Sequence, residues 1–159
     1  MNLQSPPSIV LDALAKGDLN AANAFLGFEY YLTGTVVHGD HLGTKLGFPT
    51  ANLLLDKDSP LLLPLGVYVI TVLLGKIKKH GLSSIGMRPT VNGKDLRVEI
   101  HVFDFSGNLY HQRLQVSFME RLREELKFNS LQELILQMER DKLAALALLA
   151  RRNQKDPNT

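Results

Sequence analysis

The pattern of hydrophobic and polar residues divides the chain into two helical ends and a β-rich middle. Apolar residues recur every three or four positions in residues 8–26 and again from Ser130 to about Ala150. Between them, from Tyr30 to about Val116, short runs of β-branched and aromatic residues are separated by Gly, Pro and Asn. Several short strands followed by one helix predict a mainly β fold, an antiparallel barrel or sandwich covered by a helix.

Capping residues mark where the helices are expected to begin. Gly17 divides the first helical region into two short segments, and Ser8 and Asp18 are each predicted to be the N-cap of one segment. Ser130 is predicted to cap the last helix, because Glu133 follows three residues later and completes a capping box.

The middle region contains several separate strand signals. Residues 66–74 (GVYVITVLL) form a β-branched run, and residues 81–85 resume the pattern after a basic turn. Residues 86–93 contain a proline and an Asn-Gly pair, and we expect them to form a loop. The strict alternation in residues 96–105 predicts a strand that forms a hairpin with residues 109–118 across a short Ser-Gly-Asn turn.

Composition and charge mainly exclude classes of protein. A chain of 159 residues with 45% apolar and 21% charged residues is typical of one globular domain. The absence of cysteine excludes disulfides, thiolate zinc sites and a cysteine nucleophile. A net charge of +2, without interleaved aromatic and basic residues, gives only weak support for a nucleic-acid partner. We see no secretory signal and no apolar segment long enough to span a bilayer, so we expect a cytoplasmic protein without a membrane partner.

A pair of polar residues follows a glycine-rich stretch in residues 43–53 (GTKLGFPTANL). Thr50 and Asn52 are separated by one residue, so on an extended backbone they face the same side. A hydroxyl and an amide oxygen are hard, neutral ligands that suit Mg²⁺ bound to phosphate. Pro49 presets the backbone before them, and the upstream glycines allow a loop to close over a nucleotide. Alternatively, the two side chains only satisfy backbone groups in a turn.

A carboxylate lies in the middle of the alternating strand LRVEIHVFDF, residues 96–105. Glu99 shares one face with Arg97 and His101, and its carboxylate could act as a general base toward a hydroxyl. The residues alone favour the alternative that Glu99 and Arg97 form the solvent face of a half-buried strand. His101 has no second histidine at ligand spacing, so we interpret it as a surface or supporting residue and not as a metal ligand.

A segment rich in arginine leads into the last helix, in residues 121–134 (RLREELKFNSLQEL). Arg121, Arg123 and Phe128 precede the helix start, where a cation and an aromatic ring could hold an anionic or planar ligand. Alternatively, these side chains only seat the helix against the rest of the fold. The segment does not distinguish between the two roles by itself.

Together these motifs resemble those of the riboflavin kinase (flavokinase) domain, over a stretch from about Tyr30 to Ala150. The resemblance rests on five blocks in this order: GTVVHGDHLGTKLGFPTANL, GVYVITV, SSIGMRPTVNG, VEIHVFDFSGNLY and RLREELKFNSLQEL. It is to the bacterial form, usually the C-terminal half of bifunctional riboflavin kinase/FAD synthetase. It implies a mainly β fold, a six-stranded antiparallel Greek-key barrel with N-terminal linker helices and a C-terminal helix. It also implies transfer of the γ-phosphate of ATP to the 5′-hydroxyl of riboflavin with Mg²⁺; the alternative is a barrel that binds flavin or nucleotide without turnover.

The resemblance further implies roles for individual residues. Glu99 matches the catalytic base, and Thr50 and Asn52 match the residues that hold Mg²⁺ and the nucleotide phosphates. The residues implied to bind ATP are Gly39, His41, Gly43, Thr44, Lys45, Gly47, Pro49, Thr50 and Asn52. Those implied to bind the flavin are Asn52, Glu99, Arg123, Glu125 and Phe128. Two positions depart from the family pattern, since the family usually has Arg at the place of Thr44 and Gly at the place of His111.

The resemblance also divides the chain into parts. Residues 28–152 correspond to the kinase domain, residues 1–27 to a helical linker or remnant of a preceding nucleotidyltransferase domain, and residues 153–159 to a disordered tail. The H-x-G-H motif of that nucleotidyltransferase is absent, and Ile9 and Leu11 are apolar where its S-S-T-x-I-R motif would fall. We therefore expect no FMN adenylyltransferase activity from this chain alone, and we expect the full-length protein to contain a nucleotidyltransferase domain.

Overall fold

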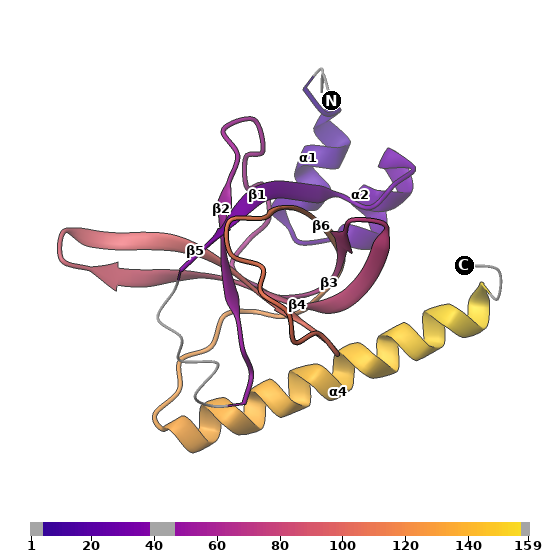
Figure 1. The fold of residues 1–159 in the computed structure, drawn as a ribbon. Coiled ribbons are helices and arrows are strands. Elements are labelled where there is room, and N and C mark those ends of the chain that lie inside the picture. The colour runs from indigo at the N-terminus through magenta and orange to yellow at the C-terminus, as the bar shows by residue number, and fades with distance from the viewer. Residues whose placement is uncertain (1–4, 39–46, 157–159) are drawn as a thin grey trace.

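Six antiparallel strands close into a barrel in the computed structural model, which describes residues 5–38 and 47–156 (Figure 1). Around the barrel the strands follow the order β1-β2-β5-β4-β3-β6. The strands are β1 (Tyr31–Val37), β2 (Ala51–Leu55), β3 (Gly66–Leu74), β4 (Ile77–Thr90), β5 (Gly93–Val102) and β6 (Arg113–Arg123). The helices are α1 (Ser8–Ala15), α2 (Leu19–Leu26) and α4 (Leu131–Lys155). The predicted mainly β, six-stranded antiparallel barrel with a C-terminal helix is confirmed.

Strand β3 shows how the sequence pattern follows from burial. Its side chains are buried almost without interruption, because both faces of the strand are covered. Tyr68, Ile70 and Val72 point into the core that fills the barrel, whereas Val69 belongs to a second cluster formed with α4. In β1, by contrast, buried and half-buried residues alternate, since only the inner face meets the core.

Helix α4 packs along the outer wall of the barrel, as Figure 1 shows. The buried residues of this second cluster are Val69, Phe103, Met119, Ala145, Leu148 and Leu149. Ser130 caps the helix as predicted, its hydroxyl oxygen accepting from the backbone N–H of Glu133 at 3.2 Å. The predicted end near Ala150 is wrong, because the helix continues to Lys155 and Arg152 donates to the carbonyl of Met119 at 3.2 Å. No helix within the described ranges is long and apolar enough to cross a membrane.

Helices α1 and α2 contribute to the same core as the barrel strands. Asp18 caps α2 as predicted, accepting from the backbone N–H of Ala21 at 3.1 Å. Ser8 is not a cap, because Pro7 occupies that position and no side chain makes the capping hydrogen bond. The side chain of Asn23 accepts from the backbone N–H of Tyr30 at 2.7 Å and donates to a carbonyl of β6, which ties α2 to the barrel.

The loop predicted for residues 86–93 is wrong, because β4 continues through this segment to Thr90. It pairs with β5 until Thr90 meets Gly93, so the two strands form a long hairpin arm that projects beyond the barrel (Figure 1). Strand β3 pairs with β4 only as far as Ile85, so one edge of β4 is unpaired beyond that point. A proline, which lacks a backbone N–H, is tolerated on such an edge because no neighbouring strand requires a donor there.

The predicted hairpin between residues 96–105 and 109–118 is also wrong. Strand β5 pairs with β2 and β4, and β6 pairs with β1 and β3, so these two alternating segments are not neighbours. Residues 103–112 connect them instead. Positive φ angles of 51° at Asp104 and 65° at His111 turn the backbone near the two ends of this connection. The alternation identified both strands, but pairing partners depend on the closed barrel.

Candidate active site

The residues predicted as a metal ligand and a general base lie directly opposite each other. Asn52 of β2 pairs with Glu99 of β5 in the antiparallel ladder. Directly paired residues project to the same face of a sheet, so the amide and the carboxylate share one side of the barrel wall. Asn52 is 6% exposed, and the Glu99 side chain is 17% exposed. The structure thus brings together two side chains that are far apart in the sequence and that were singled out independently.

Thr50 immediately precedes β2 and is held in place through its neighbour. Nδ1 of His101 donates to the carbonyl oxygen of Pro49 at 2.7 Å, which fastens the segment before β2 to strand β5. His101 is therefore a supporting residue, as expected, and Phe48 packs edge-on against its ring at 6.0 Å between ring centroids. Because side chains alternate along the chain, Thr50 and Asn52 face the same way.

Thr50 and Asn52 carry side-chain oxygens of the hard type that Mg²⁺ prefers. The amide nitrogen of Asn52 lies 3.5 Å from the carbonyl of His38, and its Oδ1 has no hydrogen-bond partner among residues 5–38 and 47–156. Within those ranges there is no cluster of three His, Asp or Glu side chains that could hold a metal alone. Mg²⁺ usually keeps several waters and takes few protein ligands besides substrate phosphates, so a pair of protein oxygens is compatible with such a site.

An ion pair joins the predicted base to an arginine that sequence reasoning missed. Nη2 of Arg88 donates to Oε1 of Glu99 at 2.8 Å. Arg88 lies in the segment that was interpreted as a loop, and no role in the site was predicted for it. Once β4 extends to Thr90, Arg88 falls on the same face as Ser84, the direct partner of Glu99.

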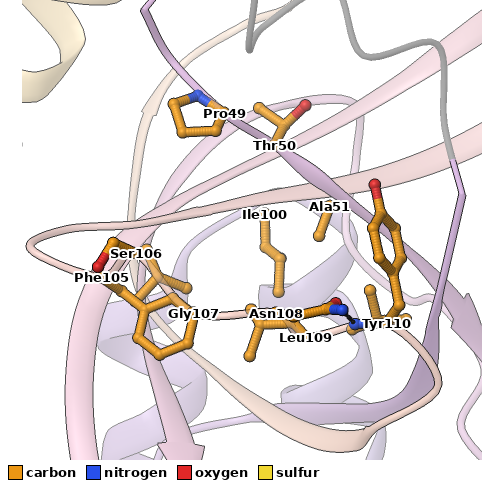
Figure 2. Close-up of a pocket in the computed structure, with 12 residues that line it drawn as sticks. Pro49, Thr50, Ala51, Ile100, Phe105, Ser106, Gly107, Asn108, Leu109 and Tyr110 are labelled. Atoms are coloured by element: carbon orange, nitrogen blue, oxygen red, sulfur yellow. Dashed lines mark hydrogen bonds between the residues drawn. The ribbon is translucent and has the colours of Figure 1, made fainter.

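A pocket of about 230 Å³ opens at one end of the barrel beside Thr50 (Figure 2). Its lining comprises Val36, Pro49, Thr50, Ala51, Ile100, Val102, Phe105, Ser106, Gly107, Asn108, Leu109 and Tyr110. Figure 2 shows Thr50 on one side of this space and Asn108 with Leu109 on the other, between Phe105 and Tyr110. The Asn108 side chain accepts from the backbone N–H of Tyr110 at 2.9 Å, and His38 stacks on the Tyr110 ring at 4.0 Å between centroids.

Sequence reasoning missed most of this pocket. It assigned the Ser-Gly-Asn residues to a hairpin turn, whereas the connection 103–112 forms one wall of the pocket. Of the residues predicted to bind nucleotide, Gly39, His41, Gly43, Thr44 and Lys45 lie outside the described residues. Gly47 has a φ of 81°, a left-handed conformation that favours glycine over residues with a side chain.

The predicted flavin residues are divided between two environments. Arg123 makes a bidentate ion pair with Asp141 of α4, at 2.8 Å from Nη2 and 2.9 Å from Nε, and its guanidinium lies 5.9 Å from the centroid of the Phe128 ring. These contacts seat the helix, one of the two roles left open by the sequence. The carboxylate of Glu125 lies over Gly86, in the space that a Cβ at this position would occupy. Gly86 is two residues from Arg88 on the same strand face, so Glu125 lies on the side of the sheet that carries the Arg88–Glu99 pair.

A family model described as riboflavin kinase (Flavokinase) matches residues 26–149. The bifunctional riboflavin kinase/FMN adenylyltransferase of Haemophilus influenzae is 42% identical over 135 residues, covering 83% of this chain and 42% of the relative. The protein of the same description from Escherichia coli K12 is 43% identical over 138 residues, covering 86% and 43% respectively. The chain therefore spans less than half the length of these curated relatives.

Solved structures share the fold. The riboflavin kinase from Trypanosoma brucei superposes with a TM-score of 0.54 at 27% identity, over 76% of this chain and 79% of that one. A chain described as a macrolide-efflux protein from Streptococcus pneumoniae superposes with a TM-score of 0.80 at 31% identity, over 87% of this chain and 45% of that one.

Proposed function

The chain belongs to the riboflavin kinase family, and from this premise we propose that it transfers the γ-phosphate of ATP to the 5′-hydroxyl of riboflavin. The observation that carries the proposal is the cross-strand pair of Asn52 and Glu99, which sets an amide side chain beside a carboxylate on one face of the sheet. In the reaction the hydroxyl oxygen bonds to the γ-phosphorus and the bond to the β–γ bridging oxygen breaks. ADP leaves, FMN forms, and the hydroxyl proton passes to Glu99 and then to solvent.

Thr50 and Asn52 would hold Mg²⁺ together with the β- and γ-phosphates. When bound, the ion neutralises charge on the transferred phosphoryl group. The burial of Asn52 and the hydrogen bond from His101 to Pro49 support this role, because both restrict where the two oxygens lie. Most of the acceleration in such a site comes from positioning and charge neutralisation.

We assign the pocket beside Thr50 to the base of ATP. Its apolar surface, to which Ile100 and Leu109 contribute, suits a planar ring, and the Asn108 side chain supplies polar groups at the edge. Thr50 borders both this pocket and the Asn52–Glu99 pair, so the phosphates would run across Thr50 from the pocket to the base. The implied nucleotide loop from Gly39 to Gly47 precedes this segment in the chain.

We assign the flavin to the opposite side of Glu99, toward the segment that follows β6. The position of Glu125 over Gly86 supports a role in binding the flavin, because it places this carboxylate near the face that carries Glu99. Asn52 and Glu99 would meet the ribityl hydroxyl, whereas Arg123 and Phe128 would contribute from the base of α4. The kinase module would comprise residues 28–152, preceded by a linker in residues 1–27.

The full-length protein is proposed to be a cytoplasmic bifunctional enzyme in which a nucleotidyltransferase domain accompanies the kinase module. The names of the curated relatives support this, since each combines a riboflavin kinase with an FMN adenylyltransferase. The substrates of the module are then the small molecules riboflavin and ATP.

A turnover assay with Glu99→Gln tests the function. The purified chain is given riboflavin, ATP and Mg²⁺, and FMN is separated by chromatography and measured by its fluorescence. Glutamine keeps the shape of the side chain but cannot accept the proton, so kcat should fall by about 10²–10⁴-fold while ATP still binds.

Two outcomes would contradict the proposal in different ways. A wild-type chain that binds riboflavin and ATP without forming FMN would be a non-catalytic flavin or nucleotide-binding barrel. A Glu99→Gln variant with the wild-type rate would show that Glu99 is not the base. Glu99 would then only form part of the solvent face of its strand, the alternative that the residues alone favoured.

A further inference from the structure

Arg88 is the closest charged partner of Glu99 in the described structure, at 2.8 Å between Nη2 and Oε1. In the ladder, however, Arg88 lies opposite Asp95, and Glu99 lies opposite Ser84. The ion pair therefore crosses the β4–β5 arm diagonally. Arg88 contacts Glu99 although Asp95 lies directly opposite it. Asp95 lies 3.8 Å from the guanidinium of Arg97 instead.

The residue between these two positions of β4 allows the diagonal contact. Gly86 lies between Ser84 and Arg88 on the same strand face and has no side chain to occupy the space. The Glu125 carboxylate uses part of this space, because it lies where a Cβ at Gly86 would be. One short segment of β4 thus contacts both carboxylates that the proposed function assigns to the site.

The contact engages one carboxylate oxygen of Glu99, the proposed base, and not the other. Oε1 of Glu99 accepts a charge-assisted hydrogen bond, which is shorter and more directional than a neutral one. Oε2 has no hydrogen-bond partner among residues 5–38 and 47–156. The Arg88 and Glu99 side chains are 38% and 17% exposed, so the pair is partly buried and its charges remain within reach of solvent.

We propose that Arg88 is a positioning residue, which fixes Oε1 of Glu99 so that Oε2 faces the 5′-hydroxyl of riboflavin. This inference rests on the proposed function, because it assumes that Glu99 is the base. Arg88 acts through Glu99 and need not touch either substrate. A misplacement of about 1 Å in such a site lowers the rate by about 100-fold, which sets the scale of the expected effect.

A double-mutant cycle on kcat separates this role from direct contact with the transferred phosphate. The four proteins are wild type, Arg88→Met, Glu99→Gln and the double variant, assayed for FMN formation under saturating substrates. Arg88→Met should lower kcat by about 10- to 100-fold in the wild-type background, with KM for ATP changed by less than about 2-fold. In the Glu99→Gln background the same substitution should change kcat by less than about 2-fold, because no carboxylate remains to be positioned.

Two further variants control the cycle. Arg97→Met removes an arginine from the same face of the same arm, one that pairs with Asp95 and not with Glu99, and should leave kcat unchanged. Arg88→Lys keeps the positive charge but loses the planar guanidinium group, so its kcat should lie between those of Arg88→Met and the wild type. If Arg88→Met does not fold, Arg88→Lys takes its place in the cycle, with a smaller loss that should also disappear beside Glu99→Gln.

The outcomes distinguish the inference from the function on which it rests. Normal kcat in Arg88→Met would overturn the inference and leave the kinase assignment intact. An equal loss of kcat in both backgrounds would also overturn it, since Arg88 would then act on the phosphate directly. Failure of the wild-type chain to form FMN would remove the function and the inference together.

Discussion

At the scale of single residues, the proposed metal site depends on two neutral oxygens. Thr50→Ala or Asn52→Ala should lower turnover sharply and raise the Mg²⁺ concentration needed for half-maximal rate. Each substitution removes one proposed Mg²⁺ ligand and leaves the net charge of the protein unchanged. The measurement is a magnesium titration of FMN formation. Thr90→Ala, at the exposed end of β4, is the matched control. Unchanged titration curves in both site variants would mean that these side chains only satisfy local backbone groups.

At the scale of elements, the ion pair between Arg123 and Asp141 fastens α4 to the end of β6. Asp141→Asn should lower the free energy of unfolding by about 2 kcal/mol, because a bidentate, largely buried contact is lost and the guanidinium keeps no charged partner there. It should also raise KM for riboflavin while KM for ATP stays constant, since Arg123 is proposed to lie beside the flavin.

Thermal unfolding and steady-state kinetics measure both effects. Glu139→Gln, on the exposed side of α4, provides a control with the same loss of charge. If Asp141→Asn is as stable as this control, the ion pair does not seat the helix. If its KM for riboflavin is also normal, Arg123 is not part of the flavin site.

At the scale of the whole molecule, the chain should perform one reaction and not two. Given FMN, ATP and Mg²⁺, it should release no pyrophosphate and form no FAD, because it lacks the H-x-G-H motif of the nucleotidyltransferase. Pyrophosphate release and FAD fluorescence measure this directly, and riboflavin under the same conditions is the positive control. FAD formation by the purified chain would reveal a second active site that neither the sequence nor the structure indicated.

The parts of the site that could be predicted are those carried by local patterns. The one-residue spacing of Thr50 and Asn52 placed both on one face, and the alternation around Glu99 placed it on a strand. Arg88 could not be predicted, because a proline and an Asn-Gly pair made its segment look like a loop. That segment is a strand because it pairs with β5 as far as Thr90, and its proline is tolerated because the other edge of β4 is unpaired there.

By itself, the sequence determined the type of most elements, most of the helix caps and the candidate residues of a phosphoryl-transfer site. These features depend on neighbours a few positions apart, whose periodicity and hydrogen bonding are local. Only the tertiary structure decided that β5 pairs with β2 and β4, that Asn52 therefore faces Glu99, and that a connection expected to be a hairpin turn forms a pocket wall. The physical reason is that strand pairing is settled by closing the barrel around one shared core, to which residues distant in sequence contribute together.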